Sequence, residues 1–346
     1  MSNARQPAWG EPAPWFTAEV PDGSRYELSN MAGRFVALIF FGNSEASNAR
    51  DFLANLGKMK NGIRKHALIF GVSSDRNDLQ NENVIKAFPP ARVFFDQNRQ
   101  IASRYGQTTD AANSAKHNNQ SQWFILDPTL RIYSVGSLAN FQQFEKEIGS
   151  LPYPKDHTAT IDKAWAPVLL VPRVLTPDTC RHLIDYYSRT KAGQSGFMKT
   201  EKGKTIAKQN IKFKSRKDVA ITDPELKRTI RTAIETRLVP EIKKAFQFRA
   251  TRMERFIVAR YDSSEGGRFR AHRDNTTGRT AHRRFAVSIN LNSSQYEGGE
   301  LRFPEFGDRL YSPPTGGAIV FSCSLLHEAM PVTAGERYVT LPFLYD

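Results

Sequence analysis

The sequence predicts an α/β domain followed by a mainly β domain that is braced by helices. The chain has 346 residues, which is long enough for two separate cores. In the first half, apolar runs typical of buried strands alternate with helix-like stretches, and this alternation indicates a central sheet flanked by helices. In the second half, many short strands are separated by Gly and Pro turns, a pattern typical of an antiparallel barrel or double-sheet jelly roll.

The predicted α/β domain covers residues 1–150. Its expected strands are at 35–41, 67–72, 91–95 and 123–126. Its expected helices are at 48–60, 79–87 and 141–147. The polar stretch 107–122, which contains His117, has few apolar anchors, so we interpret it as a mobile surface loop.

A Pro-containing polar linker is expected at 151–165, and the second domain at 166–346. The second domain opens with a strand at 168–171 and a helix that begins at Pro177, with Thr176 as its cap. Apolar residues recur with a period of 3.6 over 223–246, which predicts a helix pair that braces the barrel from outside. Further strands are expected at 256–261, 285–291, 318–321 and 338–343.

The amino-acid composition limits the classes of protein to which this chain can belong. The chain is 40% hydrophobic and 24% charged, as in soluble globular proteins, and no apolar run is long enough to span a bilayer. No secretory signal is visible, and the two cysteines, Cys180 and Cys323, are far apart in sequence, so we expect a cytoplasmic protein. Cys180 lies among apolar positions and is expected in the core.

The net charge of +14 is concentrated in the second half. Residues 1–150 hold 16 Lys and Arg against 14 Asp and Glu, and the remaining residues hold 33 against 21. This excess fits an anionic substrate or partner, and it equally fits a solvated surface. The most basic stretch, 193–217, reads as a flexible loop that is either a lid over the active site or a solvated hairpin.

His272-Arg273-Asp274 carries the main chemical signal. If these residues lie on a strand, His272 and Asp274 point the same way, because side chains alternate between faces. With His327 from a neighbouring strand they form a two-His-one-carboxylate triad, a set that suits Fe(II) and leaves positions open for a co-substrate and O₂.

The segment from Tyr261 to Tyr345 resembles the catalytic core of the prolyl 4-hydroxylase-like Fe(II)/2-oxoglutarate dioxygenases. The matching pieces, in order, are Tyr261, Gly-Gly, an aromatic, H-x-D, Leu-Asn, Gly-Gly-Glu-Leu, Phe-Pro, Gly-Gly and H…P-V-x-x-G-x-R, which ends at Arg337. The resemblance implies a double-stranded β-helix (jelly-roll) fold for this domain.

The resemblance also implies residue roles. His272, Asp274 and His327 would be the Fe(2+) ligands, Arg337 would bind the distal carboxylate of 2-oxoglutarate, and the hydroxyl of Tyr261 would support that carboxylate. Arginine suits the task because it grips a carboxylate through two parallel hydrogen bonds. O₂ would be the second co-substrate, and ascorbate is an optional reductant.

The implied reaction hydroxylates a prolyl or other residue of a protein, or a small molecule, with release of succinate and CO₂. One alternative is oxidative demethylation of nucleic acid, but demethylases carry further arginines after the co-substrate arginine, and this chain has none after Arg337. We therefore do not expect nucleic acid or a membrane as a partner. Another alternative is a non-catalytic adaptor that uses the first domain.

Residues 1–150 resemble a thioredoxin-fold domain of the peroxiredoxin type. The resembling pieces include Gly10-Glu11-Pro12-Ala13-Pro14-Trp15-Phe16, Gly71-Val72-Ser73-Ser74-Asp75 and Phe124-Ile125-Leu126-Asp127-Pro128. A peroxiredoxin needs a thiolate, yet this half contains no cysteine, so cysteine-based chemistry is excluded. The expected roles are a homodimerisation face, a dock for the substrate of the other half, or a structural remnant.

Overall fold

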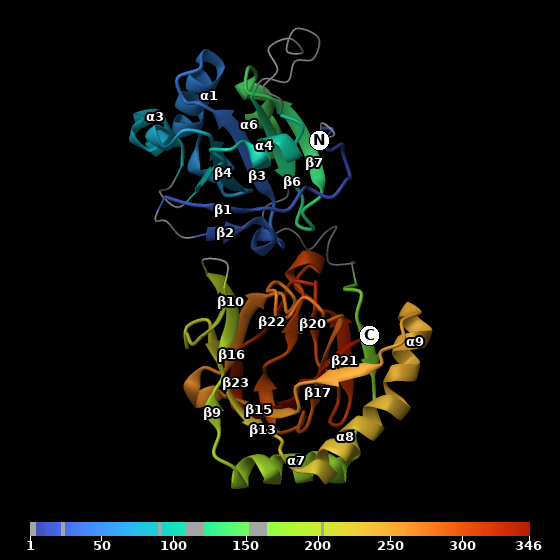
Figure 1. Ribbon diagram of the computed structural model, residues 1–346. Helices are drawn as coiled ribbons and strands as arrows, with labels where there is room; N and C mark the ends of the chain where they lie inside the picture. The colour runs from blue at the N-terminus through green and yellow to red at the C-terminus, as the bar shows by residue number, and fades with distance from the viewer. Residues whose placement is uncertain (1–4, 22–24, 89–91, 108–120, 152–164, 202–203) are drawn as a thin grey trace. The chain divides into compact units, whose positions relative to one another are not determined.

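The computed structural model describes residues 5–21, 25–88, 92–107, 121–151, 165–201 and 204–346 (Figure 1). The chain divides into two compact units: Met1–Lys163 with Pro304–Gly307, and Ala164–Phe303 with Asp308–Asp346. The predicted linker and the predicted loop at 107–122 lie, except for their end residues, outside the described residues. The linker boundaries therefore stay a prediction. Within the described ranges, no helix is both long and apolar enough to cross a membrane.

The first unit is built on a seven-stranded sheet in the order β2-β1-β5-β4-β3-β6-β7. Its strands are β1 (Thr17–Glu19), β2 (Arg25–Glu27), β3 (Val36–Gly42), β4 (Leu68–Ser73), β5 (Val93–Phe95), β6 (Gln122–Leu126) and β7 (Ile132–Ser137). Strands β3, β4 and β5 are parallel, and the other pairs are antiparallel. β3 lies in the interior of the sheet, between β4 and β6, and six consecutive apolar residues bury both of its faces.

Helices cover this sheet as the alternation predicted. They are α1 (Ser47–Lys58), α2 (Asn61–Arg64), α3 (Glu82–Ala87), α4 (Gln100–Arg104) and α6 (Phe141–Ser150), with 3-10 turns η1 (Leu28–Met31) and η2 (Arg76–Gln80). Phe52 of α1 and Phe144 of α6 pack with Trp123 in one core layer. Phe40, Tyr105 and Phe124 form an aromatic cluster. The predicted α/β thioredoxin-like fold class is confirmed.

The place where a peroxiredoxin would carry its cysteine is closed by hydrogen bonds. In the loop between β3 and α1, the buried Ser44 donates its backbone N–H to Asp78 Oδ1 at 3.0 Å. The Ser73 hydroxyl donates to the other oxygen of the same buried carboxylate. These contacts tie the loop to η2, so this loop is a packed structural element.

The second unit contains three helices, α7 (Pro177–Arg189), α8 (Pro224–Arg237) and α9 (Val239–Phe246), among its described residues. Thr176 accepts from the N–H of Thr179 and caps α7, as predicted. The apolar faces of α7, α8 and α9 are buried against the larger sheet (Figure 1). The bracing role of the pair α8 and α9 is confirmed, and Cys180 is in this core, as expected.

Besides a separate two-stranded hairpin, two antiparallel sheets make up the rest of this unit. Their strands are β8 (Leu169–Val171), β9 (Gly193–Gln194), β12 (Lys214–Ser215), β13 (Lys217–Ala220), β14 (Arg252–Glu254), β15 (Ile257–Asp262), β16 (Arg268–His272), β17 (Phe285–Asn290), β18 (Tyr296–Gly298), β19 (Leu301–Arg302), β20 (Leu310–Tyr311), β21 (Ala318–Ser322), β22 (His327–Ala329), β23 (Val332–Thr340) and β24 (Phe343–Tyr345), with turn η3 (Ser263–Glu265). The turn η4 (Pro304–Phe306) belongs to the first unit. One sheet has the order β12-β16-β22-β19-β20, and the larger one follows β14-β24-β17-β23-β15-β13-β9. This arrangement agrees with the predicted jelly-roll class.

Two sequence expectations need correction. The strand predicted at 338–343 is interrupted, because Pro342 has no N–H for the ladder, so β23 ends at Thr340 and β24 begins at Phe343. The basic stretch 193–217 is not one loop: it contains β9, the hairpin of β10 (Phe197–Glu201) and β11 (Lys204–Lys208), and β12. Lys214 and Arg216 are buried there. Lys214 lies on β12, which pairs with β16, and Arg216 lies between β12 and β13.

Candidate active site

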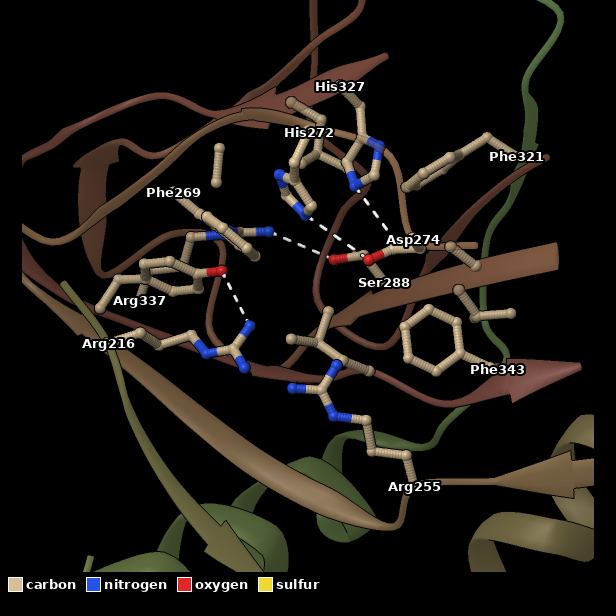
Figure 2. A pocket seen from close by; sticks show the side chains of 16 residues that line it. Arg216, Arg255, Phe269, His272, Asp274, Ser288, Phe321, His327, Arg337 and Phe343 are labelled. Carbon is tan, nitrogen blue, oxygen red and sulfur yellow. Dashed lines mark hydrogen bonds and ion pairs between the residues drawn. The ribbon is translucent and has the colours of Figure 1, made fainter. Parts of the chain in front are cut away.

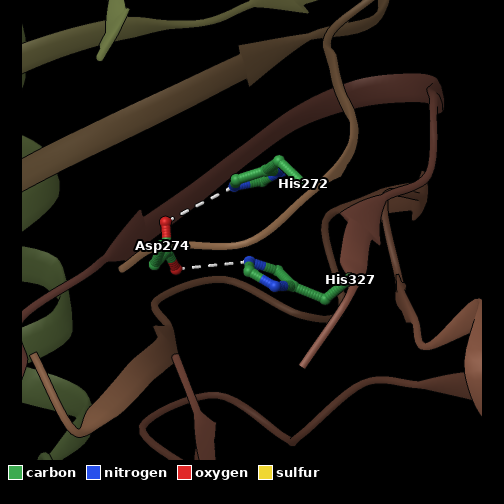
Figure 3. A group of neighbouring side chains, drawn as sticks. All are labelled: His272, Asp274 and His327. Atoms are coloured by element: carbon green, nitrogen blue, oxygen red, sulfur yellow. Dashed lines mark ion pairs between the residues drawn. The ribbon is translucent and has the colours of Figure 1, made fainter. Parts of the chain in front are cut away.

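His272, Asp274 and His327 converge in the second unit. One ligand atom from each of the three lies within 4.8 Å of the others. Nε2 of His272 is 3.5 Å from Asp274 Oδ1, and Nε2 of His327 is 3.3 Å from Oδ2 (Figure 3). The cluster is the combination of two imidazoles and one carboxylate that the motif predicted, and its role as a metal site stays a prediction.

Strand pairing brings the two histidines together. His272 ends β16, His327 begins β22, and the two are direct partners across these antiparallel strands. Asp274 does not lie on the strand, which corrects the expectation of two ligands on one strand. It follows the end of β16, where its N–H donates to the carbonyl of Cys323 at 3.0 Å. That bond turns the carboxylate back toward the histidines.

Contacts around the cluster fix the orientation of both rings. Nδ1 of His272 lies 2.8 Å from the carbonyl of Arg270, and Nδ1 of His327 lies 3.0 Å from that of Leu325. Carbonyl partners accept from a protonated Nδ1, which leaves each Nε2 as the free electron-pair donor. Phe269 stacks on His272 with ring centroids 3.5 Å apart, so the ring is held from one side as well.

The protonation states suit metal binding. Burial, followed by the neighbouring His327, lowers the pKa of His272 to about 4. Burial acts to raise the pKa of Asp274, but the neighbouring His327 and His272 outweigh it and hold that pKa well below its usual range. A neutral imidazole and an ionised carboxylate are the forms that bind a cation. The donor set therefore fits a divalent metal such as Fe(II).

Arg337 is a buried cation with no acidic partner among the described residues. It lies on β23 and is 2% exposed. Its Nη2 donates to Asn290 Oδ1 at 3.1 Å and to Ser288 Oγ at 3.3 Å, and its Nε has no hydrogen-bond partner in the described part of the chain. A buried guanidinium without a carboxylate is costly. Its environment therefore suits a carboxylate supplied by a ligand.

Tyr261 lies directly across from Arg337 on the neighbouring strand β15. The guanidinium carbon of Arg337 is 5.3 Å from the centre of the tyrosine ring, and the hydroxyl accepts from Nη1 of Arg216 at 3.2 Å (Figure 2). The hydroxyl thus has a protein partner already, and its predicted role in supporting the co-substrate stays a prediction. Thr340, which strand alternation places on the opposite face from Arg337, does not line the pocket.

One pocket contains all five predicted site residues. The empty space it encloses, counted out to its open mouth, is about 470 Å³. The remaining lining residues are Arg216, Arg255, Phe269, Ala286, Val287, Ser288, Leu301, Phe321, Ala329, Leu341 and Phe343. Both sheets contribute, since Leu301 and Ala329 come from the smaller sheet and Val287 comes from the larger.

Sequence reasoning did not single out Arg216, Arg255 or Phe269 as pocket residues. The spacing of two between Arg216, which directly precedes β13, and Asp218 on β13 was a usable signal for their ion pair. Arg255 lies between β14 and β15 and had no such signal. His282 and Arg283 do not line the pocket; both contact Glu254. His66, in the first unit, has its Nδ1 2.6 Å from the carbonyl of Leu151.

Comparison with known families agrees with both resemblances. The sequence model of the 2OG-Fe(II) oxygenase superfamily matches residues 256–345, and that of the AhpC/TSA family matches residues 9–135. The first match spans the triad, Tyr261 and Arg337. Each half of the chain thus contains a segment that matches one of these family models, as the motifs predicted. The oxygenase family implies Fe(2+) and 2-oxoglutarate as cofactor and co-substrate.

Individual relatives are distant. The chain is 34% identical over 98 residues to the multifunctional procollagen lysine hydroxylase and glycosyltransferase LH3 of Rattus norvegicus, a match that covers 27% of this chain and 12% of the relative. Among solved structures, a prolyl-4-hydroxylase of Pseudomonas putida is 18% identical to this chain, with a TM-score of 0.37. The match covers 55% of this chain and 95% of the hydroxylase chain. A peroxiredoxin-like protein of Aquifex aeolicus is 13% identical to this chain, with a TM-score of 0.34. The match covers 42% of this chain and 88% of the Aquifex chain.

Proposed function

We propose that the chain is an Fe(II)- and 2-oxoglutarate-dependent dioxygenase that hydroxylates a residue of a protein, prolyl or other, or a small molecule. One observation carries the proposal: a two-His-one-carboxylate cluster shares a single pocket with Arg337, a buried cation that lacks a carboxylate partner among the described residues. The superfamily match over residues 256–345 supports the same activity.

His272, Asp274 and His327 would hold the iron through Nε2, a carboxylate oxygen and Nε2. When bound, Fe(II) supplies the activation of O₂ that insertion of oxygen into a C–H bond needs. The role of the three side chains is to present neutral imidazoles and an anionic carboxylate on one side of the ion. The carbonyls behind both Nδ1 atoms keep the rings from rotating away.

Arg337 would bind the distal carboxylate of 2-oxoglutarate. Ser288 and Asn290 engage one of its terminal nitrogens and set the plane of the guanidinium, while its Nε remains available. Tyr261, across the strand pair, would contact the same carboxylate. Apolar side chains around the site, such as Phe321 and Phe343, exclude water and strengthen the ion pair.

The proposal defines the substrate less narrowly than the reaction. The lysyl and prolyl hydroxylases among the relatives are similar to this chain over too little of their length, or at too low a similarity, to assign their substrates. The cysteine-free first unit would serve as a homodimerisation face or as a dock for the substrate, or it is a structural remnant. Its closed serine loop fits a binding or structural role better than a redox role.

Succinate formation tests the activity. Purified protein is incubated with Fe(II), 2-oxoglutarate, ascorbate and cell extract, and succinate is quantified by NMR. The wild type should form succinate in a manner that depends on Fe(II), and His272→Ala should not. His282→Ala is the matched control, because His282 lies in the same unit but outside the pocket. Equal succinate from wild type and His272→Ala would contradict the proposal.

A further inference from the structure

The pocket holds two arginines besides Arg337, and they differ in how they are bound. Arg216 is fully engaged: its Nε and Nη2 each lie 2.7 Å from an oxygen of Asp218, Nη2 also donates to Ser195, and Nη1 donates to Tyr261. It is 3% exposed. Arg216 is therefore part of the wall of the pocket, a bidentate ion pair that also orients Tyr261.

Arg255 has a much weaker attachment. Its single ion pair among the described residues is a 3.4 Å contact to Asp218 Oδ2, an oxygen that Arg216 already engages at 2.7 Å. Its side chain is 27% exposed, and its guanidinium carbon lies 5.5 Å from the centre of the Phe343 ring. Figure 2 shows its guanidinium among the side chains that line the pocket. Most of its five N–H donors are thus available to a ligand.

The backbone at Arg255 is unusual as well. Its φ is +68°, in the left-handed region that residues other than glycine rarely adopt. The residue joins β14 to β15, and this conformation accompanies the entry of a charged side chain into the pocket. Strained non-glycine residues concentrate where a side chain has a function that outweighs the strain.

The charges of the pocket do not balance. Arg216, Arg255 and Arg337 are cationic, and only Asp274 in the lining and Asp218 behind it are anionic. On the proposed function, a divalent iron and a doubly anionic 2-oxoglutarate would cancel each other, so one positive charge remains. Arg216 is neutralised by Asp218, and Arg337 would be neutralised by the co-substrate. The remaining charge therefore belongs to Arg255, in a half-enclosed apolar setting where an unpaired cation is costly.

We propose that the primary substrate carries a carboxylate or similar acidic group, that Arg255 binds this group, and that the C–H bond to be hydroxylated is thereby held near the metal. This inference rests on the proposed function. A bidentate contact would supply both charge neutralisation and orientation, since the guanidinium is planar and rigid. The acidic group belongs either to a free small molecule or to an acidic residue of a protein chain.

Matched pairs of acids and amides test the proposal on a catalytically inert complex. Protein loaded with Mn(II) and saturating 2-oxoglutarate, without O₂, is titrated calorimetrically with butyrate and butyramide as free small molecules. The second pair is N-acetyl-aspartate N-methylamide and its asparagine counterpart, which represent an acidic or neutral residue in a chain. The variants are Arg255→Leu, Arg255→Lys and the control Arg252→Leu, which removes an exposed arginine three residues away that does not line the pocket.

The wild type and Arg252→Leu should bind at least one acid about 10- to 100-fold more tightly than its amide. This ratio of affinities corresponds to the free energy of a hydrogen bond to a charged group. Arg255→Leu should lose this preference, and Arg255→Lys should retain part of it. The pair that shows the preference identifies the source of the acidic group. If the acids bind no better than the amides, including the case in which neither binds, or if Arg255→Leu keeps the preference, the inference is wrong. Failure of Mn(II)-dependent 2-oxoglutarate binding in the wild type would instead overturn the proposed function.

Discussion

Nη2 of Arg337 donates to Oδ1 of Asn290 at 3.1 Å, so a neutral amide stands where a buried arginine ordinarily has a carboxylate. Ser288 is equally neutral, and no acidic side chain pairs with Arg337 in the described ranges. The protein thus holds a guanidinium whose surroundings are complementary to an anion. This relationship has consequences for both binding and stability.

The first prediction concerns Arg337→Gln. Affinity for 2-oxoglutarate on the Mn(II)-loaded protein should fall by at least about 30-fold, because a buried charge pair would be lost. The thermal unfolding midpoint without ligand should not fall, since the arginine has no carboxylate partner to lose. Calorimetry and a thermal scan measure the two quantities, with Arg252→Gln as the control. An unchanged affinity would remove Arg337 from the co-substrate site.

The second prediction concerns Phe269, which stacks on His272. Phe269→Leu should weaken metal binding by about 10-fold, the lower end of the effect of losing a group that orients a ligand. The affinity can be measured by competition with a fluorescent zinc chelator. Phe248→Leu is the control, because Phe248 packs on Phe285 away from the pocket. If both variants bind metal like the wild type, the stacking does not position the ring.

The sequence predicted what depends on local pattern and short spacing. The buried run of β3, the cap at Thr176 and the triad were accessible because period, capping residue and motif each have a direct physical meaning. The prediction that Asp274 lies on the strand was wrong. Its position depends on a hydrogen bond to the carbonyl of Cys323, which is 49 residues away in the sequence, and no local pattern encodes such a contact. Arg255 was missed for the same reason, since its conformation is set by the junction of two strands.

The third prediction concerns Asp218 and pH. Burial alone would raise the pKa of Asp218, but Arg216 and Arg255 outweigh it and lower the pKa to about 2. A lowered carboxyl pKa contributes stability that is present above its unfolded value, near 4, and is lost as pH falls toward 2. Asp218→Asn should therefore cost about 3–5 kcal/mol near neutral pH, because Arg216 would stay buried without its partner.

The pH dependence separates this effect from simple loss of packing. Urea unfolding of wild type and Asp218→Asn should differ by a constant amount above about pH 4, and the difference should shrink as pH falls toward 2. The exposed Asp346→Asn should show little difference at any pH. A difference between wild type and Asp218→Asn that persists unchanged to pH 2 would show that the charge of Asp218 is not its source.

The fourth prediction concerns the serine loop of the first unit. Asp78→Ala should destabilise this unit by about 1–3 kcal/mol, because the Ser44 N–H and the Ser73 hydroxyl would lose their buried acceptor. Unfolding monitored by tryptophan fluorescence measures the loss, and Asp51→Ala on the exposed face of α1 is the control. A loss no larger than that of the control would contradict the structural role assigned to this contact.

The most direct test of the central claim is a mass-spectrometric search for one added oxygen. Cell extract is treated with Fe(II), 2-oxoglutarate and either wild-type protein or His272→Ala, and both peptides and small molecules are analysed. The account predicts at least one product that gains an oxygen with the wild type and not with the variant. A gain on a peptide would identify a protein hydroxylase, and a gain on a metabolite would identify a small-molecule hydroxylase. The same oxidised products with both proteins, or none with the wild type while 2-oxoglutarate is converted to succinate, would contradict hydroxylation by this site.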